Sequence, residues 1–416
     1  MLIEIHMIQN HTPSNINRDD LGAPKTCMFG GTLRARISSQ CLKRSIRRSE
    51  VFRTPLAEWL GVRTKYFPDL VREKLPDSGI PKADHAGIVL AASKIAKREE
   101  QTSGKAPEET EDDRPKTAQL IFLGPQEADA FIRRLERLRE DDEWASAYKK
   151  LVQDKLKGKA LQKFHRELRQ AYAKRSVDVS LFGRMTTSEA FENVEAAMEV
   201  AHALSTHDIR NEVDYFTAVD DLETGTGAGH VAENQYNSAC YYKYFSLDWD
   251  LLKANLAGDD TSQDELAGRA LGHFIRAAAC TVPTGKKKGH ANNNLPDGVL
   301  VEIKREKIPT SYANAFAASV QPDAQGLIAE SILALGHYVG SVVNGYGIDS
   351  RRLWFAPQGF ALEYVPPKAD DEQTPPQPVS VATPVTSLDA LIEKTLSALG
   401  LDWPKLKQVR DAEDTP

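Results

Sequence analysis

Residues 32–48 read TLRARISSQCLKRSIRR, and this stretch predicts a strand followed directly by a basic helix. Residues 32–37 alternate polar and apolar side chains, as an edge strand does, and Ser38 or Ser39 supplies a helix N-cap. On a helical wheel Leu42 and Ile46 lie about 40° apart and form a narrow apolar seam. Four cations share the half of the helix away from that seam: Lys43, Arg44, Arg47 and Arg48.

This basic face favours an external polyanion as its partner. The cations stack at i, i+4 spacing, where like charges repel mildly. Ser38, Ser39 and Gln40 stand where free N–H groups at the start of the helix point outward, which suits a phosphate. A merely solvated basic face is the alternative, and the spacing alone leaves both open.

Charge is segregated along the chain. The 416 residues carry a net charge of −6, with 41% hydrophobic and 27% charged residues, ordinary values for a globular protein of two or three domains. Residues 18–53 nevertheless hold nine basic and three acidic residues, a local charge of +6, while residues 99–113 hold seven acids. The overall acidity therefore does not exclude nucleic-acid binding, because phosphates respond to the local field.

No membrane span, signal peptide or cysteine-based metal site is predicted. The chain has no run of about 18 apolar residues, and its start lacks the basic and long apolar segments of a signal peptide. The cysteines are far apart in the sequence, without a CxxC pair, which favours a reducing compartment: Cys27, Cys41, Cys240 and Cys280. We expect a soluble, cytoplasmic protein.

The order of elements predicts an α+β fold with large insertions. Residues 2–8 are expected to form a strand, 51–175 a mainly helical insertion, 177–181 a strand and 192–204 a helix. Residues 366–384 are rich in proline and predict a linker, and 387–399 a last amphipathic helix.

Residues 212–245 predict a long hairpin with a flexible tip. Two β-prone runs, 213–222 and 238–247, flank a segment containing Gly225, Gly227 and Gly229. Aromatic side chains crowd this region and could stack on bases. For 241–245 we favour packing onto the core, whereas Tyr215 and Phe216, nearer the tip, remain open between the two roles.

The candidate catalytic motifs are weak, and we predict no catalytic residue, metal or cofactor. Asp220 and Asp221 are neighbours on a predicted strand and would point to opposite faces, so only one could readily hold magnesium. His202 and His207 are five apart, which does not match a zinc helix. Gly183-Arg184-Met185 lacks the lysine and glycine spacing of a phosphate-binding loop.

The chain resembles the CasC (Cse) family within the RAMP superfamily, the backbone subunit of the type I-E CRISPR Cascade surveillance complex. The matching motifs lie in family order between residues 2 and about 348. They are His11-Thr12-Pro13-Ser14, Asn17-Arg18-Asp19-Asp20, Phe29-Gly30-Gly31, Arg36-Ile37-Ser38-Ser39-Gln40, Leu42-Lys43-Arg44, Gly183-Arg184-Met185, Thr187-Ser188, Ala201-His202-Ala203, Thr206-His207, Asp214, residues 216–222, Ala313-Asn314-Ala315-Phe316 and Asn344-Gly345-Tyr346-Gly347.

The resemblance implies an RRM-like (ferredoxin-like) palm with a helical fingers insertion and a β-hairpin thumb. The corresponding segments are palm 1–50, fingers 51–175, palm 176–208, thumb 209–239, palm 240–365, a proline-rich linker 366–386 and a C-terminal helix and tail 387–416. In the family, several copies polymerise along one CRISPR RNA and present its spacer to target DNA, together with large, small and guide-end-capping subunits. The family is not catalytic.

The family's RNA-contacting positions fall on residues of this chain. The resemblance places Met185 and Thr187 beside a kinked nucleotide, although by itself the sequence would favour an ordinary core methionine. Tyr215 stands where a familiar member carries tryptophan, and His230 lies near the thumb tip. The remaining positions are Arg18, Lys25, Ser38, Gln40, Lys43, Arg44 and Arg47 in the palm, and Phe216, Thr217 and Val219 on the thumb.

Two other functions compete with this one. Backbone subunits of type III effector complexes share the fold and cleave RNA with an acidic residue, for which Asp220 or Asp221 would be the candidate here. An unrelated possibility is a scaffold protein whose basic helix docks another protein.

Overall fold

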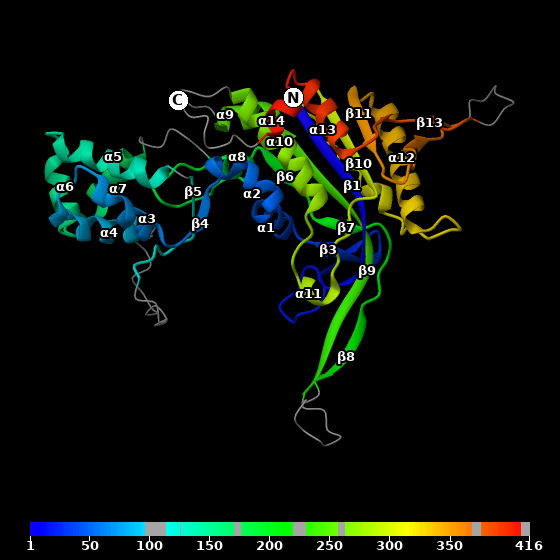
Figure 1. Cartoon of the computed structure of the whole chain (residues 1–416), viewed down its shortest axis with the longest axis horizontal. Coiled ribbons are helices and arrows are strands. Elements are labelled where there is room, and N and C mark those ends of the chain that lie inside the picture. The colour runs from blue at the N-terminus through cyan, green and yellow to red at the C-terminus, as the bar shows by residue number, and fades with distance from the viewer. Residues whose placement is uncertain are drawn as a thin grey trace. The chain divides into compact units, whose positions relative to one another are not determined.

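The computed structural model describes residues 1–95, 114–124, 126–169, 176–218, 230–256, 263–367 and 376–408. The chain has a mixed α+β fold with a large, mostly antiparallel sheet, as predicted (Figure 1). It divides into two compact units. The first comprises Met1–Pro55, Met198–Asp250 and Gly268–Pro416, and the second Leu56–Ala197 and Leu251–Ala267.

A ten-stranded sheet organises the first unit, in the order β14-β11-β10-β1-β9-β7-β3-β2, with β6 and β8 also paired to β9. Every pairing in it is antiparallel except β11 with β14. The strands are β1 (Leu2–Ser14), β2 (Thr26–Phe29), β3 (Thr32–Ile37), β6 (Met198–Val200), β7 (Ala203–Ser205), β8 (Glu212–Ala218), β9 (His230–Asp248), β10 (Gly298–Lys304), β11 (Ser350–Phe355) and β14 (Thr383–Pro384).

Helix α12 (Leu327–Tyr346) packs on one face of this sheet. Its buried Leu335 and Val339 share a core cluster with Leu300 of β10 and Trp354 of β11. In the described part of the chain, α12 is the one helix long and apolar enough to meet the criteria for a membrane span. Of its apolar window, 39% is buried, on the side that packs against the sheet.

The opposite face of the sheet is covered by α10 (Gln263–Cys280). Phe274 of this helix packs edge-on against Phe245 of β9, with ring centroids 5.4 Å apart. Helices α13 (Leu388–Ser397) and α14 (Trp403–Lys407) follow, and a Cβ on Gly272 would lie 2.3 Å from the Trp403 ring. Glycine at 272 is therefore what lets the C-terminal segment pack closely against α10.

The second unit is largely helical, with one core of its own that includes Phe67, Phe131 and Phe164. Its helices and strands are α2 (Glu50–Leu56), β4 (Val62–Thr64), α3 (Phe67–Lys74), α4 (His85–Lys94), β5 (Ile121–Leu123), α5 (Glu127–Glu140), α6 (Ala145–Val152), α7 (Gly158–Arg169), α8 (Val177–Phe182) and α9 (Trp249–Leu256). Of these, α2 and α9 begin or end in the first unit.

Two local predictions were wrong. Residues 192–204 form no helix but contain β6 and β7, both of which pair with β9. Residues 177–181 are not a strand but lie in α8, where the Ser176 side chain accepts a hydrogen bond from the Val179 N–H as an N-cap. Pairing with the distant strand β9 decided the first conformation, whereas a local N-cap accompanies the second.

Part of the predicted linker is attached to folded structure. Strand β13 (Val379–Ser380) pairs with β12 (Glu363–Tyr364), and β14 pairs with β11. The acidic stretch at 99–113 lies outside the described residues.

Buried charges are paired inside the sheet of the first unit. Glu4 and Glu302 are fully buried, and the Lys304 ammonium contacts Glu4 and lies 3.7 Å from the Glu302 carboxylate. Burial tends to raise the pKa of Glu302, but His6, Lys304 and Tyr312 together hold that pKa below its usual value. Glu4, His6 and Glu302 are close enough together to hold a metal ion, yet Lys304 already supplies the counter-charge.

We expect Lys304→Met to lower the free energy of unfolding by about 3–5 kcal/mol, because it leaves the fully buried Glu4 carboxylate without its cation. Urea denaturation measures this loss. Lys307→Met is the matched control, since Lys307 pairs with Asp248 and Asp250 at the surface; it should leave stability nearly unchanged. Equal losses in the two variants would contradict the structural role of Lys304.

Candidate nucleic-acid interface

Helix α1 (Ser39–Arg48) presents the predicted basic face. The Ser38 side chain caps it by accepting a hydrogen bond from the Cys41 N–H at 3.3 Å, and Ser49 closes its other end by donating to the Ile46 carbonyl at 2.8 Å. Leu42 and Ile46 are the buried residues of the helix. The predicted apolar seam is confirmed, so the cations lie on the remaining surface.

Several cations on and beside α1 form no ion pair with other described residues. Arg44 and Arg48 are exposed, while Lys43 and Arg47 are half-buried. Burial lowers the pKa of Lys43. Within the described residues, Arg18, Lys25, Lys43 and Arg44 form no ion pair. An unpaired cationic surface of this kind attracts a polyanion.

The loop before β2 brings further basic groups to the start of α1. The Ser38 N–H donates to Asn17 Oδ1 at 2.9 Å, and the Lys25 N–H donates to the Asn17 carbonyl at 2.8 Å. Next to them, Arg36 Nη1 lies 2.9 Å from His202 Nδ1. Burial lowers the pKa of His202, and Arg36 and Lys25 lower it further, so His202 contributes a neutral imidazole here.

Sequence reasoning missed Arg36 and His202 as members of this surface. Both residues lie in motifs that carry the family resemblance, Arg36-Ile37-Ser38-Ser39-Gln40 and Ala201-His202-Ala203, which was the available signal. Among the predicted residues, Arg18 and Gln40 are exposed and Ser38 is half-buried. The first unit therefore brings the seven predicted palm residues to α1 and the loop next to it.

Arg34, counted in the same basic window, is a core residue. It is fully buried, and its guanidinium donates to Thr32 Oγ1 and to the carbonyls of Ser205, Phe316 and Ala317 at 2.8–3.3 Å. This arginine links β3 to β7 and to the 3-10 turn Ala313–Phe316. Its charge is not available to a ligand.

Strands β8 and β9 form the predicted hairpin, which extends from the sheet (Figure 1). Tyr215 is 67% exposed and pairs across the strands with Glu233, and the Tyr236 hydroxyl donates to Glu212 at 3.2 Å. In the same strand β9, residues 241–245 are buried in the sheet, which confirms the packing role favoured for them. Tyr215 alone of these tyrosines presents most of its ring to solvent.

The structure describes the other predicted hairpin residues only in part. Phe216 and Thr217 lie in β8 opposite Ala232 and Val231, and His230 opens β9 opposite Ala218. Val219, Asp220 and Asp221 lie outside the described residues.

Met185, in the second unit, is 94% exposed. The expectation of a core methionine from sequence alone was therefore wrong. Its neighbour Arg184 is buried and pairs with Glu127 at 2.6 Å, and Thr187 donates to Gln119 at 3.0 Å. The backbone before Met185 is thus firmly held, while its side chain reaches into solvent.

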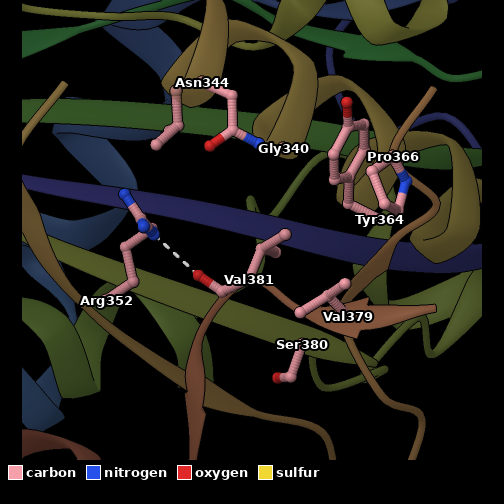
Figure 2. A pocket seen from close by; sticks show the side chains of 9 residues that line it. Gly340, Asn344, Arg352, Tyr364, Pro366, Val379, Ser380 and Val381 are labelled. Carbon is pink, nitrogen blue, oxygen red and sulfur yellow. Dashed lines mark hydrogen bonds between the residues drawn. The ribbon is translucent and has the colours of Figure 1, made fainter. Parts of the chain in front are cut away.

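A separate small cavity of about 190 Å³ lies in the first unit beside α12 (Figure 2). Arg352 lines it, but its guanidinium already donates to the Val381 carbonyl and to Ser350 Oγ, at 2.6 Å each. Val379 and Tyr364 contribute apolar walls. None of the predicted RNA-binding residues lines this cavity, and we assign it no ligand.

The fold and the site define a class: an α+β protein with a cationic helix and an extended hairpin, the kind of surface that polyanions favour. The model of the CT1975-like protein family matches residues 3–373. The chain therefore belongs to this family of CRISPR-associated (Cas) proteins. No curated protein matches the sequence.

Solved structures agree with this family. A chain of a structure described as "CRISPR RNA-guided surveillance complex, pre-nicking" is 27% identical, with a TM-score of 0.73; the match covers 96% of this chain and 100% of that one. A second, described as "CRISPR RNA-guided surveillance complex", is 24% identical over the same shares, with a TM-score of 0.64, and shows the fold alone. The resemblance stated from the motifs is thus confirmed at the level of the family.

We expect Arg34→Met to destabilise the protein by about 2–4 kcal/mol, because it leaves three buried carbonyls without donors. Arg44→Met, on the exposed face of α1, should leave the free energy of unfolding nearly unchanged and instead weaken polyanion binding. Urea denaturation and heparin affinity separate the two effects. If Arg34→Met weakened heparin binding while keeping full stability, Arg34 would be a ligand residue after all.

Proposed function

We propose that this protein is a CRISPR RNA-binding backbone subunit of a Cascade-type surveillance complex, of the type I-E kind. The single observation that carries the proposal is the match along 96% of the chain to a subunit of an RNA-guided surveillance complex. Lys43 and Arg44 of α1, which form no ion pair within the described residues, supply a physical reason for it, because RNA phosphates can provide their counter-charge.

The strand order supports an RRM-like palm. The run β10-β1-β9-β6 places the fourth, first, third and second strands of a ferredoxin-like unit side by side. Helix α1 falls between the first and second of these strands in the chain, and α10 between the third and fourth. On this assignment the helical second unit is the fingers and the β8–β9 hairpin is the thumb.

The proposed roles follow from exposure and chemistry. Lys43, Arg44 and Arg47 on α1, with Arg18 and Lys25 beside it, bind backbone phosphates and leave the bases free to pair with target DNA. Tyr215 offers its exposed ring for stacking on a base. Met185 offers an exposed apolar side chain on a firmly held backbone, as a wedge beside an unstacked nucleotide needs. Successive copies of the subunit along the RNA would each make these contacts.

We infer that the subunit binds RNA without cleaving it. Neighbouring acids such as Asp220 and Asp221 need a convergent third ligand or a lysine to hold magnesium for phosphodiester cleavage. The type III-like alternative depends on these two residues, and no described contact favours it.

Replacing both Lys43 and Arg47 with alanine should weaken binding of the protein to single-stranded RNA of any sequence. The slope of log K against log salt concentration should become shallower by about 1.4, that is, about 0.7 for each lost phosphate contact. Fluorescence anisotropy over a series of salt concentrations measures the slope. An unchanged slope would mean that this face of α1 is only solvated.

Co-expression with a guide RNA should yield a particle with several copies of the chain on one RNA, which native mass spectrometry counts. We expect deletion of residues 217–233 to leave a folded palm that still binds RNA weakly but forms no ordered filament. A full-length particle from the deletion variant would refute the thumb assignment.

An RNA cleavage assay on the same particle distinguishes RNA binding alone from the type III-like cleavage activity. Complementary RNA should remain intact in magnesium or manganese. Cleavage that disappears in Asp220→Asn or Asp221→Asn would establish the type III-like activity instead.

A further inference from the structure

The loop between α10 and β10 carries three consecutive lysines, Lys286, Lys287 and Lys288, that the proposed function does not use. They lead into a short helical turn, α11 (Lys287–His290). Lys286 and Ala291 bracket the turn with left-handed backbone, at φ 43° and 47°, which is uncommon outside glycine. The shape of the loop is therefore imposed by its contacts.

Those contacts attach the loop to the palm and to the base of the hairpin. A Cβ on Gly285 would lie 2.2 Å from the Ile16 carbonyl oxygen, so the loop crosses the chain directly after β1 at close range. The Lys286 ammonium donates to Asn234 Oδ1 on β9, and the His290 ring lies 6.1 Å from the Tyr236 ring, centroid to centroid. The side chain of Lys286 thus has a structural partner. Within the described residues, the side chains of Lys287 and Lys288 form no such hydrogen bond.

An open pocket of about 460 Å³ lies between this loop and the hairpin base. The three lysines and His290 line it, and Asp214 is the one acidic residue among the described residues that line it. In the part of the chain that the structure describes, Lys287 and Lys288 form no ion pair. The pocket is thus cationic, is large enough for a phosphate group, and opens to solvent, which suits an extended polyanion.

The segment after β1 connects this pocket to the basic face of α1. Asn15 is buried and donates from Nδ2 to the Gln235 carbonyl at the hairpin base and to the Gly22 carbonyl, each at 2.9 Å. Ile16 meets Gly285, and Asn17 accepts from the Ser38 N–H at the start of α1. Three residues in sequence thus join the lysine loop, the hairpin and α1.

We propose that Lys287 and Lys288 form a second phosphate-binding site, which holds the backbone of the single-stranded RNA where it passes the base of the hairpin. The inference rests on the proposed RNA-binding function but uses residues separate from the α1 face. Asn234 fixes Lys286, so the two following lysines are held at the pocket before RNA binds. This site would hold the RNA at the hairpin, while α1 holds it on the palm.

The test compares the salt dependence of RNA binding between variants of the full-length protein. With a labelled single-stranded RNA, K287Q/K288Q should make the slope of log K against log salt shallower by about 1.4. K287R/K288R should restore the wild-type slope, because it keeps the charge. K149Q/K150Q, which removes two adjacent exposed lysines of α6, should leave the slope unchanged.

The outcomes separate this inference from the proposed function. RNA binding by the wild type, with a slope that K287Q/K288Q does not change, would overturn the second site and leave the α1 site standing. A loss seen with duplex DNA but not with single-stranded RNA would overturn the assignment to the RNA strand. Failure of the wild type to bind RNA at all would overturn both proposals.

Discussion

The backbone hydrogen bonds of β9 are the constraint on which the first unit depends. This 19-residue strand pairs with β1 through its second half and with β8 through its first residues. One continuous strand is therefore both a central member of the sheet and one arm of the hairpin. Because a ladder fixes the register of its strands, the position of Tyr215 relative to the palm is set by the same bonds that hold the core.

The segment Asn15 to Asn17 also holds elements of the first unit in position relative to one another. It lies directly after β1 and contacts the hairpin base, the lysine loop and the start of α1. The lysine loop and α1 carry cations, and the hairpin carries the exposed ring of Tyr215. Polar contacts of this kind are worth about 0.5–1.5 kcal/mol each, yet together they determine how the candidate RNA-binding groups are spaced.

Several motifs that mark the family have structural roles. Arg34, between Phe29-Gly30-Gly31 and Arg36-Ile37, donates to the carbonyls of Phe316 and Ala317, at the end of Ala313-Asn314-Ala315-Phe316. A Cβ on Gly30 would lie 1.7 Å from the Ala317 carbonyl oxygen, so only glycine permits this approach. Motifs nearly 300 residues apart in the chain thus contact one another. A match to the family therefore cannot by itself distinguish a ligand-binding residue from a core residue.

The sequence by itself determined those structural features that depend only on residues close together in the chain. The period of Leu42 and Ile46 fixed which face of α1 is basic, and two β-prone runs around a glycine-rich segment defined the hairpin. Tertiary structure decided the rest: residues 192–204 became strands because β9 offers them backbone partners, and Arg34 became buried because carbonyls from residues 205, 316 and 317 surround it. The exposure of Met185 and the contact between the lysine loop and Asn234 also depend on residues far away in the chain. Local periodicity reports the preference of a segment, but which groups satisfy a buried charge or an open strand edge depends on residues far away in the chain.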